Sequence, residues 1–334
     1  MNERSLLHKN EKFLQAREGK SVDEVSTTRS QESIPSAMKV SLVLATKARV
    51  AEIQRFLRSL TRQGSSHLEL IVVDQNEDDR LAATLSQSNL PFPIVHLRSE
   101  AGLSRARNVG IASATGGIIA FPDDDCWYPE GLLARVVSEF QRHPLVDGFT
   151  GRSEDERGRP SGGSFSRHQS QVDLKNVWRK GISYTIFLRS SVCAAVGSFD
   201  EELGLGARTR FVSGEETDYL IRAVQSGFNI QYLPNLVVFH PNPILYNRRH
   251  CTKAFHYGVG MGKVLSEHHY PFSYNLSVIL RPVAGALLSL VTLRARKAAY
   301  HLAIAAGRVS GLWSQQQWRP AKRRSVIAAV RPGK

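Results

Sequence analysis

The sequence has few cysteines and no apolar run at its N-terminus. Its 3 cysteines, Cys126, Cys193 and Cys251, are odd in number and far apart, so they match neither a disulfide framework nor a zinc-binding spacing. We therefore expect a reducing compartment, in which thiols stay free. Because no signal-peptide pattern opens the chain, we expect no export by that route. These absences favour a cytoplasmic protein.

Two nucleotide-binding fingerprints are also missing. No GxxxxGK[ST] loop occurs, and no GxGxxG follows the first predicted strand. These absences argue against a P-loop triphosphatase and against a dehydrogenase of the dinucleotide-binding type. We find no internal repeat and no nucleic-acid-binding motif, so we expect no nucleic-acid partner.

Acidic residues are nearly absent from the C-terminal part of the chain. The net charge of +14 lies entirely in residues 244–334, where Glu267 is the only acid, whereas residues 1–243 are neutral. A basic tail of this kind favours an anionic partner.

The basic tail also contains an apolar run, Val278–Leu293, which Arg281 and Pro282 interrupt. The run is shorter than the roughly 20 residues that a helical membrane span needs. We predict a tail that lies on an anionic membrane surface or dips into it. The alternative is a buried helix pair with a basic surface.

Apolar runs alternate with helical patterns between residues 40 and 140. The predicted strands are Val40–Thr46, Leu68–Asp74, Ile94–Leu97 and Ile118–Phe121. Helices are predicted from Val50, over Gly102–Ala114 and over Leu132–Phe140. At 334 residues the chain is long enough for one large α/β domain plus an appendage. The alternation predicts a Rossmann-like, mainly parallel sheet flanked by helices.

The rest of the chain gives weaker patterns. Residues 1–37 are polar and predict a flexible leader, with one short helix at Leu6–Ala16. Residues 152–168 are rich in Gly, Ser and charges and predict a mobile loop. Further predicted elements are an ordered segment Ile182–Leu188, helices at Ser190–Val196 and from Gly214 to Ser226, and strands Ile230–Leu233 and Leu236–His240 separated by Pro234.

Three consecutive carboxylates follow the strand that ends at Phe121. If Asp123, Asp124 and Asp125 are buried together, they repel one another and need a counter-charge. Mg²⁺ or Mn²⁺ commonly supplies this counter-charge, because these hard cations bind carboxylate and phosphate oxygens together. The end of a strand in an open α/β sheet is also where ligands bind. The alternative is an acidic cap for the helix after Pro129.

Four motifs, taken in order, resemble the inverting glycosyltransferases of family two, which have the GT-A fold. They are the first strand with Thr46, the second strand ending in Val-Val-Asp74, the carboxylate run, and Gly214-Glu-Glu-Thr-Asp218. The segment Leu103–Gly110 is similar to the ARN-x-G helix of the family. The resemblance covers about residues 39–243. It implies a GT-A catalytic domain over 38–243, between the leader 1–37 and a basic, helical tail 244–334.

The resemblance also implies a nucleotide-diphosphate-sugar donor, bound across the strand ends with a divalent metal on its diphosphate. The implied nucleotide-binding residues are Thr46, Asp74, Gln75, Arg105 and Asp123, and the implied metal ligands are Asp124, Asp125 and His240. The register within the carboxylate run stays open. Gln75 replaces a second Asp of the family, which leaves the base open, with uracil as the first choice. Each of these side chains also has a structural interpretation, such as a helix charge for Arg105.

The acceptor hydroxyl must lose a proton during transfer, so a carboxylate must lie near it. The resemblance places Glu216 at the position of the family's base, although Glu is one methylene longer than the usual Asp. Glu215 and Asp218 are the alternative catalytic residues. Acids in the first turn of a helix can also simply complement the helix dipole.

We therefore expect metal-dependent, inverting transfer of a sugar from a UDP-sugar to a glycan or lipid-linked acceptor. The expected setting is exopolysaccharide or other envelope glycan synthesis on the inner face of the cell membrane. One alternative is a pyrophosphorylase-like nucleotidyltransferase, for which Thr46-Lys-Ala-Arg49 is a poor phosphate loop. The other is an inactive scaffold that binds glycans or partner proteins.

Overall fold

The computed structural model describes residues 38–64, 67–241 and 245–314. The predicted leader and its short helix lie outside these ranges. The described residues belong to one compact unit, so the sheet and the C-terminal helices can be placed relative to each other.

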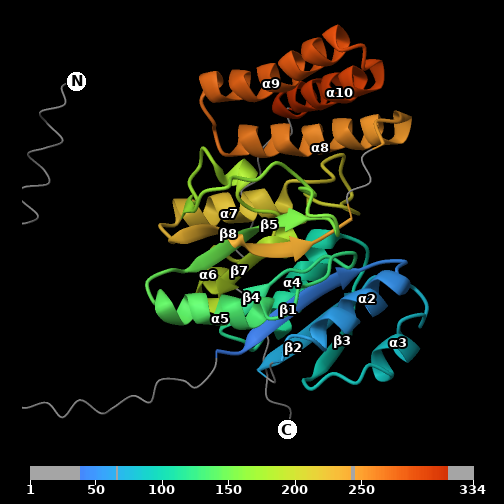
Figure 1. The fold of residues 1–334 in the computed structure, drawn as a ribbon, viewed down its shortest axis with the longest axis vertical. Helices are drawn as coiled ribbons and strands as arrows, with labels where there is room; N and C mark the ends of the chain where they lie inside the picture. The colour runs from blue at the N-terminus through green and yellow to red at the C-terminus, as the bar shows by residue number, and fades with distance from the viewer. Residues whose placement is uncertain (1–37, 65–66, 242–244, 315–334) are drawn as a thin grey trace, which may run out of the picture. The chain divides into compact units, whose positions relative to one another are not determined.

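An eight-stranded sheet forms the centre of the described protein (Figure 1). Its strand order is β3-β2-β1-β4-β7-β5-β8-β6. The strands are β1 (Val40–Thr46), β2 (Leu68–Asp74), β3 (Ile94–Arg98), β4 (Ile118–Ala120), β5 (Gly148–Glu154), β6 (Ser170–Gln171), β7 (Ile186–Arg189) and β8 (Ile230–Phe239). Strands β1 to β4 pair in parallel, whereas β7 runs antiparallel to both β4 and β5. The predicted α/β fold with a mainly parallel sheet is confirmed.

Helices cover both faces of the sheet. They are α2 (Ala51–Leu60), α3 (Ala82–Ser86), α4 (Leu103–Ser113), α5 (Leu132–Arg142), α6 (Ser190–Val196) and α7 (Glu215–Gln225). Alternate residues of β1 enter two separate cores: Leu42 and Leu44 pack with α2 and α5, whereas Val43 and Ala45 pack with α4 and α7. Burial on both faces explains why this strand is a continuous apolar run.

One prediction for the second half of the sheet is wrong, because β8 is one strand of 10 residues rather than two. The predicted loop 152–168 is wrong only at its start, since β5 continues to Glu154. Pro234 is tolerated because it lies where the β5–β8 ladder shifts register, between Thr150 and Arg152. Its carbonyl accepts a hydrogen bond from Arg152 Nε at 2.6 Å instead. The sequence shows the proline but not the bulge that accommodates it.

Three long helices follow the sheet and lie together at the top of Figure 1: α8 (Arg248–Glu267), α9 (Phe272–Val291) and α10 (Ala295–Leu312). Helices α8 and α10 approach at glycines, since a Cβ on Gly307 or Gly311 would lie 2.1 Å from a backbone oxygen of α8. Gly260 of α8 packs equally closely on Ser213, just before α7. The helical layer therefore rests directly on the turn that contains the acidic motif.

The interrupted apolar run of the tail is a continuous helix. Helix α9 passes through Pro282 and starts six residues before the predicted run, giving 20 residues. Within the described ranges it is the one helix that is long and apolar enough to cross a membrane, and 22% of its most apolar window is buried. By length and composition alone, a single helix of this kind is weak evidence for a span.

Candidate active site

The carboxylate run lies at the carboxyl ends of β1 and β4. Ala45 forms an isolated bridge with Asp123, and Thr46 Oγ1 donates a hydrogen bond of 2.9 Å to Asp124 Oδ2. Ser183 Oγ donates to Asp123 Oδ1 at 3.0 Å. Two of the predicted site elements, the end of the first strand and the Asp triplet, therefore meet at one edge of the sheet.

Arg107 links this edge to the acidic motif of α7. Its Nη2 lies 3.2 Å from Asp123 Oδ1 and its Nη1 lies 3.0 Å from Glu215 Oε1. The Arg107 and Glu215 side chains are 1% and 6% exposed, so their ion pair is shielded from water, whereas Asp123 is 29% exposed. Breaking a buried pair leaves an uncompensated charge, which makes such contacts costly to lose. One guanidinium thus connects two motifs that are 92 residues apart in the sequence.

The last carboxylate of the run contacts His240, which follows β8. His240 Nε2 lies 3.1 Å from Asp125 Oδ1. The imidazole is held from behind, because Ser161 Oγ lies 3.1 Å from its Nδ1 and the Tyr184 ring stacks on it at 4.9 Å. Arg49 pairs with both Asp124 and Asp125 from the loop after β1.

These side chains fit a divalent cation whose ligands come partly from the protein and partly from a substrate. A carboxylate beside an oriented imidazole is a donor set that Mn²⁺ accepts. In the part of the chain that the structure describes, no three His, Cys, Asp or Glu side chains form a complete metal site. Mg²⁺-type sites commonly take one or two protein ligands and complete the shell with phosphate oxygens and water. The roles of Asp124, Asp125 and His240 stay predictions.

The three adjacent carboxylates have different proton affinities. Burial raises the pKa of Asp123, and Arg107 only partly opposes this effect. Burial also raises the pKa of Asp124 to about 6, against the nearby charge of Arg49. Burial acts on Asp125 in the same direction, but His240 and Arg49 outweigh it and lower its pKa. Asp125 is therefore the carboxylate of the run that is most firmly ionised.

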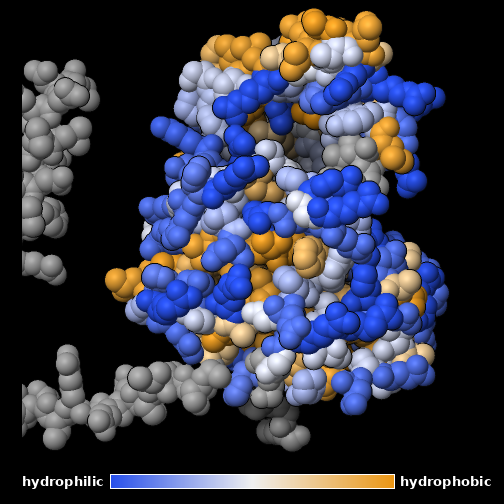
Figure 2. Space-filling model, in the orientation of Figure 1, coloured by the Kyte–Doolittle hydropathy of each residue, from blue (hydrophilic) through white to orange (hydrophobic). Residues whose placement is uncertain are grey.

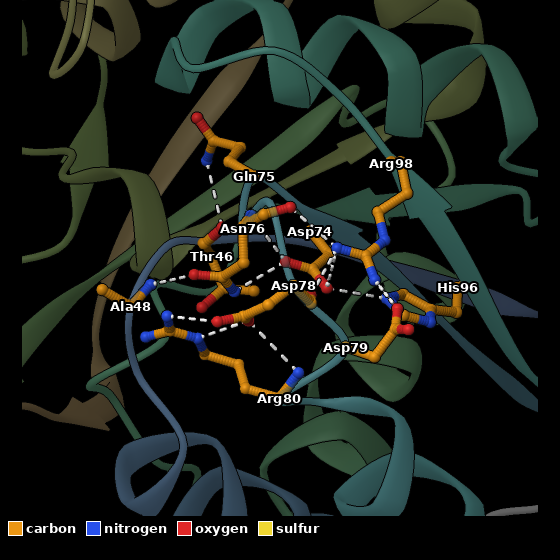
Figure 3. Close-up of polar contacts among 10 residues, drawn as sticks. All are labelled: Thr46, Ala48, Asp74, Gln75, Asn76, Asp78, Asp79, Arg80, His96 and Arg98. Carbon is orange, nitrogen blue, oxygen red and sulfur yellow. Dashed lines mark hydrogen bonds and ion pairs between the residues drawn. The ribbon is translucent and has the colours of Figure 1, made fainter.

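Asp74 is fully buried and its carboxylate is already engaged (Figure 3). Asp74 Oδ1 accepts from the backbone and side-chain nitrogens of Asn76 at 2.9 and 2.7 Å. His96 and Arg98 approach Asp74 Oδ2 from β3 at 3.0 and 3.3 Å. Figure 3 shows Arg98 reaching over the turn to Asp79 as well. The contacts identify Asp74 as the organiser of this turn, and its predicted contact with a nucleotide base is untested.

Gln75 and Arg105 also have partners within the protein. The Gln75 side chain donates to the Thr46 carbonyl at 3.4 Å and accepts from the Gly102 amide at 2.8 Å, so it ties β1 to the start of α4. Arg105 pairs with Glu100 and Glu201 at 2.5 and 3.0 Å, away from the Asp triplet. Neither contact favours the predicted nucleotide-binding roles of these two residues.

The three carboxylates of the acidic motif, Glu215, Glu216 and Asp218, lie in different environments. Glu215 is buried against Arg107, and its Oε2 has no hydrogen-bond partner among the residues that the structure describes. Asp218 is buried between Arg222 and His268, at 2.9 and 2.7 Å, which suits a structural role. Glu216 is partly exposed and, among the residues described, has no ion pair.

The environment of Glu216 favours proton binding. Burial and the neighbouring Glu215 charge raise its pKa to about 8, although Arg107 opposes them. A carboxylate with a raised pKa near a positioned substrate is a typical general base. Of the three acids, Glu216 is the one that is both accessible and perturbed.

Sequence reasoning missed the central position of Arg107. The sequence analysis assigns a nucleotide-binding role to Arg105, two positions earlier on the same predicted helix, and no role to Arg107. One signal distinguishes them: Gly110 lies one turn after Arg107, and a Cβ on Gly110 would lie 2.3 Å from Val43 of β1. The face that carries this glycine is the one pressed on the sheet, and Arg107 shares that face. Ser183 and Tyr184 carry no comparable signal in the sequence.

The family model and the relatives described here are all glycosyltransferases. Residues 41–194 match the family model described as Glycosyl transferase family 2. Glycosyltransferase AglE of Haloferax volcanii is 27% identical over 60% of this chain and 66% of its own length. An uncharacterized glycosyltransferase of Haemophilus influenzae is 33% identical over 32% of this chain and 36% of its own length. The chain thus spans between about a third and two thirds of the length of these relatives.

Solved structures agree in fold. The mannosyltransferase PcManGT from Pyrobaculum calidifontis, in complex with GDP-Man and Mn²⁺, has a TM-score of 0.59 and 14% identity, covering 84% of this chain and 89% of that one. TarS of S. aureus (residues 1–349) in complex with UDP-GlcNAc has a TM-score of 0.51 and 17% identity, covering 82% of this chain and 92% of that one. Family model, curated relatives and fold together support a glycosyltransferase family 2 domain over residues 41–194, with the GT-A fold.

Proposed function

We propose that the protein transfers a sugar from a nucleotide-diphosphate-sugar to an acceptor hydroxyl with inversion at the anomeric carbon. The observation that carries the proposal is the Arg107 bridge, which brings Asp123, at the strand ends, and the Glu215–Glu216 turn to one site. A donor at the strand ends would then have its sugar near an accessible carboxylate. An inactive scaffold would not need Glu216 to be both accessible and perturbed.

The reaction is a single displacement. The acceptor oxygen forms a bond to the anomeric carbon, the bond from that carbon to the diphosphate breaks, and the nucleoside diphosphate leaves with the electron pair. The acceptor proton moves to Glu216, which has no other ion-pair partner among the described residues and a pKa raised to about 8 by burial and by Glu215. The ion pair with Arg107 holds Glu215, the other carboxylate of the turn, in place.

Asp125 and His240 would hold a divalent cation, with Asp124 beside them. When bound, Mg²⁺ or Mn²⁺ would neutralise charge on the departing diphosphate. The complex of PcManGT with Mn²⁺ supports a metal in this fold, without deciding between the two ions. The nucleotide is proposed as UDP, although the two structural neighbours carry GDP-Man and UDP-GlcNAc respectively.

We also propose that residues 244–334 hold the catalytic domain, residues 38–243, on the inner face of the cell membrane. Side chains on the outer faces of α9 and α10 are apolar and exposed: Leu287, Leu288, Val291, Leu302 and Trp313 are 50–82% exposed. Figure 2 shows this apolar surface in orange at the top of the view. Between residues 268 and 314 there are five cations and no acid. Apolar side chains flanked by cations suit an anionic leaflet, as for an enzyme of envelope glycan synthesis.

A ligand screen tests the catalytic proposal. The melting temperature of the full chain is measured with UDP-sugars, GDP-sugars and the free nucleotides, each with and without Mn²⁺. We expect one nucleotide series to stabilise the protein, with a larger shift when Mn²⁺ is present. The absence of a shift with any nucleotide would contradict the proposal, and stabilisation by a nucleoside triphosphate alone would favour the nucleotidyltransferase alternative.

A further inference from the structure

A cavity of about 410 Å³ lies beside the acidic motif, between α8 and the loop that precedes α7. Leu205 and Val212 line it from the loop. Arg249, Lys253 and His256 line it from α8. These three residues are spaced by four and three positions, so they lie on one face of the helix.

The two permanently charged residues of this cavity have no carboxylate partner. Across the described ranges, neither Arg249 nor Lys253 forms an ion pair, and the Lys253 ammonium lies 5.1 Å from the centre of the Tyr257 ring. Other arginines near the site, such as Arg49 and Arg107, are paired with carboxylates. Cations that line a concave surface without an acid provide a site for an external anion.

The cavity adjoins the candidate base. Tyr257 belongs to its lining, and the Tyr257 carbonyl accepts a hydrogen bond of 3.2 Å from Ser213 Oγ. Ser213 precedes the acidic turn by two residues, and Gly260 of α8 packs directly on its backbone. Burial raises the pKa of Tyr257, and Glu216 is the neighbouring charge that adds most to this effect.

A second cavity, of about 640 Å³, lies near the start of α8. It is lined by Leu245 and Tyr246, just before α8, and by residues 293–297, which form the end of the α9–α10 turn and the start of α10. Leu293 is 93% exposed there, next to Arg294 and Arg296. Two residues separate Tyr246 of this cavity from Arg249 of the first. The two cavities are therefore neighbours along the chain, and the second combines apolar side chains with cations.

We propose that Arg249, Lys253 and His256 bind a phosphate group on the acceptor. The inference rests on the proposed function, because an acceptor must bring its hydroxyl to the base. A guanidinium and an ammonium bind phosphate oxygens with charge-assisted hydrogen bonds, and the arginine does so in a bidentate manner. The apolar residues Leu245 and Leu293 of the neighbouring cavity favour a lipid as the source of this phosphate.

A binding experiment tests the site without requiring turnover. The full chain, saturated with UDP or GDP, is titrated by calorimetry with octyl phosphate below its micelle concentration, with inorganic phosphate and with octanoate. The variant Arg249→Gln/Lys253→Gln removes two lining cations, and Arg248→Gln is the control one residue away, exposed and outside the cavity. All three positions are exposed, so we expect both variants to fold.

We expect octyl phosphate to bind at least tenfold more weakly to the double variant, about 1.4 kcal/mol, and within twofold of normal to Arg248→Gln. Tighter binding of octyl phosphate than of inorganic phosphate would support the lipid source, and equal binding would overturn that part. An unchanged double variant, an equal loss in Arg248→Gln, or octanoate binding as tight as octyl phosphate would overturn the phosphate site. If no nucleotide binds but octyl phosphate does, through Arg249 and Lys253, the proposed function fails and this site stands.

Discussion

Replacing Glu216 by Gln should abolish transfer and leave donor binding intact. The substitution keeps the size of the side chain but removes its ability to accept the acceptor proton. Glu216 has no ion pair among the described residues, so the substitution breaks no salt bridge there, and Gln keeps an acceptor oxygen for the backbone amide of residue 216. Loss of a positioned general base typically costs 10²–10⁴-fold in rate, which corresponds to about 3–5 kcal/mol of transition-state stabilisation.

The raised pKa of Glu216 sets the expected pH dependence. Since burial and Glu215 raise it to about 8, roughly a tenth of the molecules have an ionised base at pH 7. The kcat/KM should therefore rise about tenfold between pH 7 and pH 9 and then level off, because this parameter reports the free enzyme. The Glu216→Gln variant should lose this rise together with its activity.

The same pKa predicts an effect on stability with a defined sign. A carboxyl whose pKa is higher in the folded than in the unfolded protein binds its proton more tightly when folded, so ionisation destabilises the fold. The penalty is absent below the ordinary pKa of 4.5, grows as the pH rises, and is complete above about 8. Half of the difference between the pKa values of 4.5 and about 8, at about 1.4 kcal/mol per pKa unit, gives a loss of about 2 kcal/mol in the free energy of unfolding. Glu216→Gln should therefore be more stable than the parent at pH 8.5 and equal to it at pH 4.

The assay combines product formation with urea unfolding across this pH range. Asp218→Asn is the matched control, because Asp218 contacts Arg222 and His268 rather than the Arg107 site. The control should lose stability and keep the pH profile of kcat/KM. Glu215→Gln should also lose stability, since Arg107 would then face Asp123 alone. Normal turnover in Glu216→Gln, or loss of the pH profile in Asp218→Asn, would refute the assignment of the base.

Four further variants test the surroundings of the site. Asp125→Asn should remove the Mn²⁺-dependent part of donor binding, measured by melting temperature, whereas retention of that part would exclude Asp125 as a ligand. Arg49→Gln should strengthen Mn²⁺ binding in the absence of donor, measured by calorimetry, because Arg49 occupies the same carboxylates. Arg107→Met should lower the free energy of unfolding by about 3–5 kcal/mol, as for other broken buried ion pairs, measured by urea unfolding. A smaller loss would show that the Arg107 ion pairs contribute little to stability. Leu287→Asp/Val291→Asp should reduce flotation with anionic vesicles and keep donor affinity, and equal flotation would contradict docking through α9.

Elements fixed by local patterns could be predicted from the sequence. Strands β1 and β2 are buried on both faces and read as continuous apolar runs, and their bounds match the prediction. Helix α7 could be predicted from Gly214, which has a φ of 99° and ends the preceding loop, and from the acids that follow it. The carboxylate run could be placed at a strand end because Ile118–Ala120 is short and apolar.

Contacts between distant segments could not be predicted in the same way. His240 lies 115 residues after Asp125, and only the pairing of β5 with β8 and the bridge between Trp127 and Phe239 bring the two together. The choice between Arg105 and Arg107 depends on which face of α4 meets the sheet. Because both faces of this helix are moderately polar, Gly110 is the signal that marks the face against the sheet, and the close approach it permits is known only from the structure.

Repulsion within the Asp123–Asp125 run does require counter-charges, but a divalent metal is not their only source. The three adjacent carboxylates do have counter-charges, but Arg107 and Arg49 supply them within the protein, and His240 Nε2 lies beside Asp125. Arg107 is buried and holds Asp123 in a fixed pair, whereas Arg49 is 38% exposed and rests on the two carboxylates proposed for the metal. A cation bound at these carboxylates, as proposed, would displace Arg49, and that arginine would need a new anionic partner. The donor's diphosphate can be that partner, so metal and donor should bind more tightly together than either binds alone.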